Sequence, residues 1–209
     1  GRPWLALELI DGERIDTHCT RTKASLDARV SLVRQVARTV EYAHAHGVIH
    51  RDIKPANILV DQHGQVKLLD FGIAKLLSAD APTNGEGALT QLHGRPFTPD
   101  YASPEQRAGA MITTGTDVYA LGVILYELLT GVRPAVKGGN ATSDARAVAP
   151  SRAASRDSTA GVSEAIQPDL DAVCLKALHS DPQQRYATAS ALADDLDRYT
   201  HNEPVSAQP

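Results

Sequence analysis

Four polar residues in the first half of the chain could together support phosphoryl transfer: Asp52, Lys54, Asn57 and Asp70. Two carboxylates and an amide oxygen are hard ligands of the kind that Mg²⁺ prefers, and Mg²⁺ usually keeps several waters and shares substrate phosphates. A lysine adds positive charge for the transferring phosphoryl group, and a carboxylate can accept a proton from an attacking hydroxyl. Because catalysis of phosphoryl transfer is mostly positioning and charge neutralisation, these residue types indicate that reaction if the fold brings them together.

A predicted β-hairpin would bring the four residues together. Residues 58–60 and 66–69 are apolar runs separated by Asp61-Gln62-His63-Gly64, which is the pattern of two antiparallel strands joined by a turn. Asn57 precedes the first strand and Asp70 follows the second, so antiparallel pairing would place them at the same end. We therefore expect all four polar side chains to gather around one divalent cation at the mouth of a single cleft.

The other predicted elements make the fold class mainly α (α+β). Their positions follow from apolar residues at strand or helix spacing and from capping residues such as Ser25, Gly47, Thr188 and Gly131. The predicted elements are a buried strand over 4–10 closed by a turn at Asp11-Gly12, a helix over 26–46, a core helix over 117–130, and amphipathic helices over about 168–179 and 188–200. Three segments are predicted to be irregular: a long loop over 78–99, a low-complexity loop or linker over 135–163, and a disordered tail over 201–209.

Composition fits one ordinary domain, or one large domain cut short. The 209 residues include 21 Lys and Arg against 25 Asp and Glu, and the net charge of −4 leaves no electrostatic footprint for nucleic acid or a basic membrane-surface helix. The longest apolar run, 118–132, is broken by Glu127 and is shorter than the roughly 20 residues that a spanning helix needs. Cys19 and Cys174 are too few for a disulfide framework, so we expect a reducing, cytoplasmic location.

Several motifs, in this order, resemble those of the eukaryotic-type protein serine/threonine kinases, in particular their bacterial branch. His50-Arg51-Asp52 with Asn57 is similar to the family's catalytic loop, and Asp70-Phe71-Gly72 is similar to its magnesium-binding triplet. Further matches are Ser103-Pro104-Glu105 at the end of the activation segment, 117–122 at the start of the central buried helix, 181–186 as the late Asp-Pro-x-x-Arg element, and 4–11 as the last small-lobe strand. The resemblance implies a kinase large lobe (C-lobe) over 13–200, preceded by the strand and hinge over 1–12.

The resemblance implies ATP and Mg²⁺ as cofactors and a protein as substrate. Asp52 would be the proton acceptor, Lys54 would neutralise the γ-phosphate, and Asn57 and Asp70 would hold Mg²⁺. Thr98 would contact the catalytic aspartate and lysine. A lysine at position 54 is typical of serine/threonine rather than tyrosine kinases.

The resemblance also implies a nucleotide site and a regulatory phosphate. The backbone of Glu8 to Ile10 would be the hinge that meets adenine, and Leu59 would be the floor beneath it. Arg51 would pair with a phosphate on the activation loop, for which Thr90 is the first candidate and Thr83 the second.

Other side chains are interpreted as structural. The supporting residues would be His50 packed against Phe71 beside Gly72, Glu105 and Arg185 as a buried ion pair, and Asp117 as a helix N-cap that also bonds the catalytic-loop backbone. The remaining histidines that lack metal-like spacing, His44, His46, His63 and His93, are expected at the surface. Cys174 is expected to be a small buried hydrophobe.

Two alternatives stay open beside the protein kinase. One is a non-catalytic kinase-like module that binds partners; the retained Asp52, Asn57 and Asp70 argue against it. The other is a small-molecule phosphotransferase; Thr98 and the Ser103-Pro104-Glu105 element argue against it, because in the family they build the peptide-substrate loop.

The resemblance to the family begins at the hinge strand, so we expect most of the small lobe to be missing from this chain. In the family a Gly-rich loop, a strand lysine and a helix glutamate lie upstream of that strand. No Gly-x-Gly-x-x-Gly occurs in this chain. We therefore expect this chain alone to bind ATP weakly and to transfer phosphate poorly.

Overall fold

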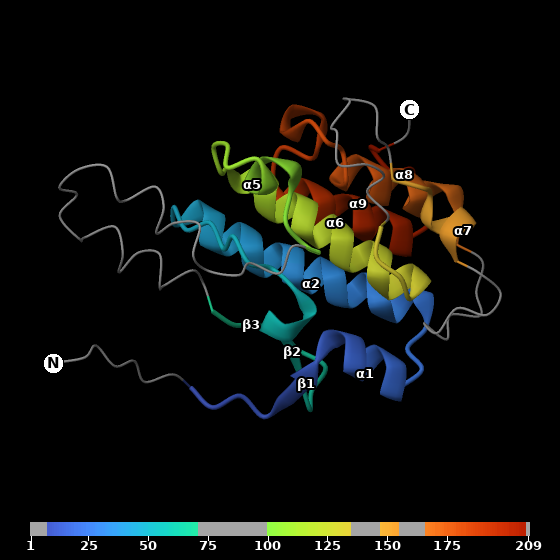
Figure 1. Cartoon of the computed structure of the whole chain (residues 1–209). Helices are drawn as coiled ribbons and strands as arrows, with labels where there is room; N and C mark the ends of the chain where they lie inside the picture. The colour runs from blue at the N-terminus through green and yellow to red at the C-terminus, as the bar shows by residue number, and fades with distance from the viewer. Residues whose placement is uncertain (1–7, 71–99, 135–146, 155–165, 208–209) are drawn as a thin grey trace, which may run out of the picture.

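Helices make up most of the fold, and a small antiparallel sheet lies beside them (Figure 1). The computed structural model describes residues 8–70, 100–134, 147–154 and 166–207. The elements in those ranges are β1 (Gly12–Arg14), α1 (Ile15–Arg21), α2 (Leu26–Ala45), the 3₁₀ turn η1 (Pro55–Asn57), β2 (Ile58–Asp61), β3 (Val66–Leu68), α5 (Pro104–Arg107), α6 (Thr114–Thr130), α7 (Pro150–Ala153), α8 (Pro168–Ala177), the 3₁₀ turn η2 (Pro182–Gln184) and α9 (Ala189–Thr200). The predicted mainly α class is confirmed.

Helix α2 has the predicted position and ends. Its N-cap is Ser25, whose hydroxyl accepts a hydrogen bond from the Ala28 N–H at 3.2 Å. Gly47 follows the helix with φ of +75°, a left-handed conformation that favours glycine. The apolar face of α2 packs against α6 and α9, and these three helices form the centre of the body (Figure 1).

Helix α6 is the buried central helix that the sequence predicts, but it begins three residues earlier than predicted. Its cap is a box formed by Thr113 and Thr116, so the predicted N-cap role of Asp117 is wrong. Gly131 ends the helix with φ of +75°. A Cβ on Gly122 would lie only 2.9 Å from the Cβ of Ala177, so this glycine permits the close approach of α6 and α8.

The predicted hairpin is confirmed as β2 and β3, with Ile58 opposite Leu68. The carboxylate of Asp61 closes the turn by accepting the backbone N–H groups of His63 and Gln65, both at 2.9 Å. The third strand, β1, pairs with β2 and gives the order β1-β2-β3.

The predicted strand over 4–10 is wrong for the part that can be examined. Residues 8–11 have no regular secondary structure, and the expected turn residue Gly12 is instead the first residue of β1. The side chain of Leu9 is 95% exposed, because no described element covers this end of the sheet. Residues 4–7 lie outside the described ranges.

Two segments predicted to be irregular contain ordered structure. Within the low-complexity stretch, α7 contacts α6 and α8. In the predicted disordered tail, Val205 is buried, and Ser206 donates hydrogen bonds from its N–H and its hydroxyl to the carboxylate of Asp195, both at 2.8 Å. These contacts hold residues 201–207 against α9, so the tail prediction is wrong there.

Cys19 and Cys174 are both free and buried, and the burial predicted for Cys174 is confirmed. Burial raises the pKa of the Cys19 thiol to about 11, so that it stays protonated at neutral pH. No helix in the described part of the chain combines the length and the apolar character needed to cross a bilayer.

Candidate active site

Three of the four polar residues singled out by the sequence are joined by hydrogen bonds in the loop before β2. The ammonium of Lys54 contacts Oδ2 of Asp52 at 2.8 Å. The side-chain amide of Asn57 donates to the Asp52 carbonyl oxygen at 2.8 Å and to Oδ2 at 3.3 Å. The turn η1 makes this possible, because it folds Asn57 back toward Asp52 directly before the strand begins.

The hairpin brings the end of β3 back to this loop. The N–H of Leu69 donates to the Asn57 carbonyl at 2.8 Å, and the Leu69 carbonyl accepts from Nε2 of His50 at 2.8 Å. Asp70, the next residue, is exposed and has φ of +55°. The backbone therefore places Asp70 beside the catalytic loop, as the hairpin argument predicts.

His50 is a supporting residue between the loop and the hairpin. Its Nδ1 accepts the Asp52 N–H at 3.3 Å while its Nε2 bonds the carbonyl of Leu69. This pattern of partners assigns the proton to Nε2. The predicted contact partner Phe71 and the adjacent Gly72 lie outside the described residues, so that contact stays a prediction.

Asp117 connects the catalytic loop to the central helix. Its buried carboxylate accepts the N–H of His50 and the N–H of Arg51, both at 2.8 Å. The predicted bonds to the catalytic-loop backbone are therefore present. A third partner is Nε2 of His44 at 2.7 Å, whose side chain is only 5% exposed.

The surface position predicted for His44 is therefore wrong. This histidine lies in the last turns of α2 and faces α6, where the carboxylate of Asp117 receives it. The two residues are 73 positions apart, and no local pattern in the sequence connects them. His46 and His63 are exposed, as predicted, and His93 lies outside the described residues.

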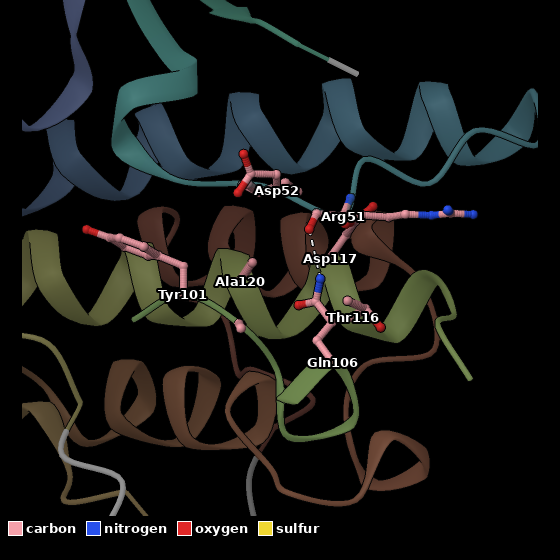
Figure 2. Close-up of a pocket in the computed structure, with 9 residues that line it drawn as sticks. Arg51, Asp52, Tyr101, Gln106, Thr116, Asp117 and Ala120 are labelled. Carbon is pink, nitrogen blue, oxygen red and sulfur yellow. Dashed lines mark hydrogen bonds between the residues drawn. The ribbon is translucent and has the colours of Figure 1, made fainter. Parts of the chain in front are cut away.

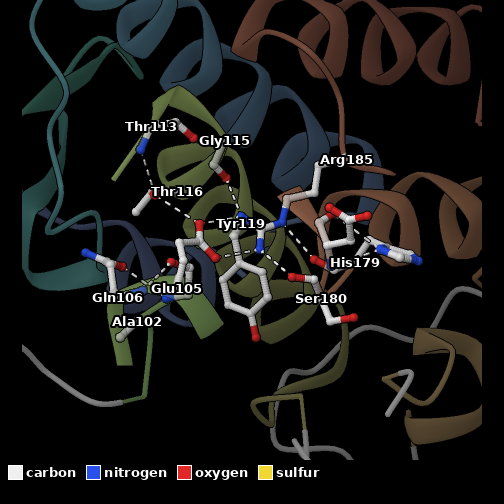
Figure 3. Close-up of polar contacts among 12 residues, drawn as sticks. Ala102, Glu105, Gln106, Thr113, Gly115, Thr116, Tyr119, His179, Ser180 and Arg185 are labelled. Carbon is white, nitrogen blue, oxygen red and sulfur yellow. Dashed lines mark hydrogen bonds and ion pairs between the residues drawn. The ribbon is translucent and has the colours of Figure 1, made fainter. Parts of the chain in front are cut away.

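Glu105 and Arg185 form the predicted buried ion pair. The guanidinium binds both carboxylate oxygens, at 2.7 and 2.8 Å, and also donates to the backbone carbonyls of Gly115, His179 and Ser180 (Figure 3). Burial alone would raise the pKa of Glu105, but the hydrogen bonds and charge of Arg185 lower it to about 2. The pair fixes α5 to the segment that follows α8.

Gln106 is a contact residue that the sequence reasoning missed. Its side-chain Nε2 donates to the backbone carbonyl of Arg51 at 2.8 Å (Figure 2). A small cavity of about 10 Å³ lies between the catalytic loop and α6, and its lining includes Arg51, Asp52, Tyr101, Gln106, Thr116 and Asp117. That volume has room for about one water molecule.

The remaining predicted site residues are separate from these contacts or outside the described ranges. Glu8 is exposed and Ile10 half-buried in the irregular segment before β1, and Leu59 is half-buried in β2. Thr83, Thr90 and Thr98 lie outside the described residues. The roles of these six residues stay predictions.

Asn57 and Asp70 supply the oxygen atoms that could bind a metal ion at this site. No three His, Cys, Asp or Glu side chains cluster as a metal site in the ranges that the structure describes. The amide nitrogen of Asn57 is hydrogen-bonded to Asp52, so the amide oxygen is the atom of this side chain that could bind a cation. One amide oxygen and the carboxylate of Asp70 fit an Mg²⁺ ion that completes its shell with waters and substrate phosphates.

Comparison with known proteins agrees with this geometry. The family model for the protein kinase domain matches residues 2–196. The chain is 34% identical over 207 residues to a probable serine/threonine-protein kinase of Streptomyces coelicolor, covering 98% of this chain and 29% of that protein. It is 34% identical over 209 residues to serine/threonine-protein kinase PknB of Mycobacterium tuberculosis (98% and 32%) and 35% identical over 204 residues to PknB of Mycolicibacterium smegmatis (94% and 30%). The chain thus spans about a third of the length of these curated relatives.

Proposed function

Because this chain belongs to the protein kinase family, we propose that it is the catalytic lobe of a serine/threonine kinase that transfers the γ-phosphate of ATP to protein hydroxyls. The observation that carries the proposal is the hydrogen-bonded set of Asp52, Lys54 and Asn57 beside Asp70. The relatives described above are all named as serine/threonine-protein kinases, which supports the same reaction.

Asp52 is the proposed proton acceptor. The substrate hydroxyl loses its proton to the carboxylate as its oxygen forms a bond to the γ-phosphorus, and the bond from that phosphorus to the bridging oxygen of ADP breaks. The ammonium of Lys54, 2.8 Å from Asp52, lies next to the reacting hydroxyl and supplies positive charge to the phosphoryl group in transfer. Thr98 is proposed to contact both.

Asn57 and Asp70 are the proposed ligands of Mg²⁺. When bound, the ion would neutralise negative charge on the phosphates of the nucleotide. The hydrogen bonds from Asn57 to Asp52 occupy the amide nitrogen and leave the amide oxygen as the proposed metal ligand. Asp52 is thereby kept for the substrate hydroxyl while the metal is held by the two neighbouring side chains.

The finer assignments are part of the same proposal. The backbone of Glu8 to Ile10 would contact adenine above Leu59, and Arg51 would bind a phosphate on Thr90 or Thr83. Both cysteines are buried and free, which suits a reducing compartment, and we place the reaction in the cytoplasm.

The test is Asp52→Asn in the full-length protein, assayed with ATP, Mg²⁺ and a generic protein acceptor and followed by phosphoamino-acid analysis. We expect kcat to fall by about 10²-fold or more, with nucleotide affinity nearly unchanged, because only proton transfer is lost. Phosphoserine or phosphothreonine should be the product in the unmodified protein. Ordinary activity in Asp52→Asn would remove the role of Asp52.

Asp70→Ala tests the metal role separately. We expect Mg²⁺-dependent nucleotide binding to weaken, as measured by titration of ATP at several Mg²⁺ concentrations. Asp27→Asn is the matched control for both variants, because Asp27 is an exposed carboxylate in the first turn of α2. Asp70→Ala that binds Mg²⁺–ATP like the unmodified protein would contradict the proposed ligand set.

A further inference from the structure

The residue before the proposed proton acceptor has a backbone conformation that side chains rarely adopt. Arg51 has φ of +70°, in the left-handed region that suits glycine. Such a conformation persists only where surrounding contacts hold it. Because Arg51 directly precedes Asp52, its peptide group sets where the Asp52 side chain starts and in which direction it extends.

Two side chains from different elements hold this strained residue. Its N–H donates to Oδ1 of Asp117 in α6 at 2.8 Å, and its carbonyl accepts from Nε2 of Gln106 in α5 at 2.8 Å (Figure 2). Asp117 is fully buried and Gln106 is half-buried. Arg51 is thus fixed at both its nitrogen and its carbonyl.

The bond from Gln106 is not needed for the helix cap in which the same side chain takes part. Oε1 of Gln106 accepts the Ser103 N–H at 3.0 Å, and the hydroxyl of Ser103 accepts the Gln106 N–H at 3.3 Å. A glutamate serves such a capping box as well as a glutamine does, because the cap needs only an acceptor. Only the contact with Arg51 requires the N–H donor that glutamate lacks.

We infer that Gln106 is a positioning residue for phosphoryl transfer, which acts by holding the Arg51 peptide and through it the carboxylate of Asp52. The inference rests on the proposed role of Asp52. It also links α5, at the end of the Ser103-Pro104-Glu105 element, to the catalytic loop. A displacement of α5 would be transmitted to Asp52 through one hydrogen bond.

Gln106→Glu is the decisive variant, because it keeps the capping box and replaces the donor with a carboxylate that faces the Arg51 carbonyl. In the full-length protein, kcat should fall about tenfold, since a misplacement of about 1 Å in a reacting group can lower the rate by about 10²-fold and a smaller shift costs less. KM for ATP should stay within about twofold, since no nucleotide contact is changed. Gln106→Met loses the donor without adding charge, and it also loses the Oε1 acceptor of the cap; kcat should again fall, but by less than in Gln106→Glu.

Gln184→Glu is the matched control. Gln184 is exposed in η2, and the described residues offer its side chain no hydrogen bond, so the same chemical change there should leave kcat and the melting temperature unchanged. Full activity in Gln106→Glu would overturn the inference. Full activity in Gln106→Met beside an impaired Gln106→Glu would also overturn it, because the introduced charge alone would then explain the loss.

A double variant separates this inference from the proposed function. If Gln106 acts through Asp52, adding Gln106→Glu to Asp52→Asn should not lower the residual kcat further. An additional tenfold fall would show that Gln106 acts by another route. Ordinary activity in Asp52→Asn alone would instead contradict the proposed function, whatever Gln106→Glu does.

Discussion

Two ion pairs of nearly the same length lie in very different surroundings in this molecule. The Lys54–Asp52 pair measures 2.8 Å and the Arg185–Glu105 pair 2.7 Å between nitrogen and oxygen. The side chains of the first pair are 20% and 41% exposed, and those of the second are 0% and 8% exposed. Distance alone therefore does not distinguish a pair that can meet a substrate from one that holds the fold.

The two pairs differ in solvent access and in the shape of the cation. The guanidinium of Arg185 binds both oxygens of Glu105 and three backbone carbonyls, and its Cζ lies 4.9 Å from the ring centroid of Tyr119. These contacts use all five N–H groups of the guanidinium, so no donor is left for a ligand. The side chain of Lys54 is 20% exposed, so its ammonium stays within reach of solvent, as its proposed contact with a transferring phosphoryl group requires.

The largest expected effect is on stability and comes from Arg185→Ala. Removing the guanidinium leaves the buried carboxylate of Glu105 uncompensated and three carbonyls without their donor, so the free energy of unfolding should fall by about 3–5 kcal/mol. Urea denaturation followed by circular dichroism measures this. The stability of Arg185→Lys should lie between that of the unmodified protein and that of Arg185→Ala, because an ammonium keeps the charge but cannot bind both carboxylate oxygens as a guanidinium does. A loss below about 1 kcal/mol in Arg185→Ala would mean that burial does not determine how much the Arg185–Glu105 pair contributes to the free energy of unfolding.

Lys54→Ala should lower activity strongly and stability little. We expect kcat to fall about 10²-fold, because a charge directed at the transferring phosphoryl group is lost. The free energy of unfolding should change by less than about 1 kcal/mol, because exposed pairs contribute little. Steady-state kinetics and urea denaturation on one preparation give both values, with Lys67→Ala on β3 as an exposed lysine control. A variant that loses as much stability as Arg185→Ala would remove the contrast between the pairs.

Acid should weaken the buried Arg185–Glu105 pair. The pKa of Glu105 is about 2, below its usual 4.5, because the hydrogen bonds and charge of Arg185 outweigh the raising effect of burial. The unfolded state therefore binds more protons between these values. The stabilisation is complete above about pH 4.5 and is lost as the pH falls toward 2.

Glu105→Gln isolates this titration. At neutral pH the variant should be less stable than the unmodified protein, because Arg185 then lacks its anionic partner. The difference in unfolding free energy between the two proteins should narrow as the pH is lowered from 5 to about 3, measured by urea denaturation at each pH. A difference that stays constant over that range would contradict the assigned pKa.

Local pattern was enough to predict the elements that carry the site. The hairpin follows from two apolar runs around Asp61-Gln62-His63-Gly64, and α2 follows from apolar spacing between Ser25 and Gly47. In both cases the interactions that define the element lie within a few residues in the sequence. The backbone position of Asp70 beside the loop then follows from antiparallel pairing alone.

What could not be predicted depends on partners that are distant in sequence. The sequence around His44 is typical of a surface position, and only the packing of α6 places Asp117 next to it. The sequence around Gln106 is typical of a capping residue, and only the fold brings its side chain within 2.8 Å of the Arg51 carbonyl. The end of the chain was misjudged for the same reason, because Val205 finds its apolar surroundings only after α9 has packed. A short, mostly polar segment in which only Val205 and Ala207 are hydrophobic carries no sign of such a contact.

A third ion pair has one buried and one exposed partner, and it should show the smallest effect. The carboxylate of Asp195 is fully buried, while the side chain of Arg198 is 44% exposed, with 2.9 Å between them. The carboxylate also accepts from the hydroxyl of Tyr186 and from the N–H and hydroxyl of Ser206, each at 2.8 Å. Arg198→Ala leaves these three donors in place, so the free energy of unfolding should fall by less than about 1 kcal/mol.

Salt should separate this pair from the buried one. The contribution of Arg198 is that of an exposed charge, so the small difference between Arg198→Ala and the unmodified protein should vanish when NaCl is raised from about 0.1 to 1 M. The loss caused by Arg185→Ala should persist at both concentrations, because water and ions do not reach that pair. A loss of 3 kcal/mol or more in Arg198→Ala, or one that salt leaves unchanged, would mean that one buried partner is enough to make a pair structural. The exposure of both partners would then no longer distinguish Lys54–Asp52 from Arg185–Glu105.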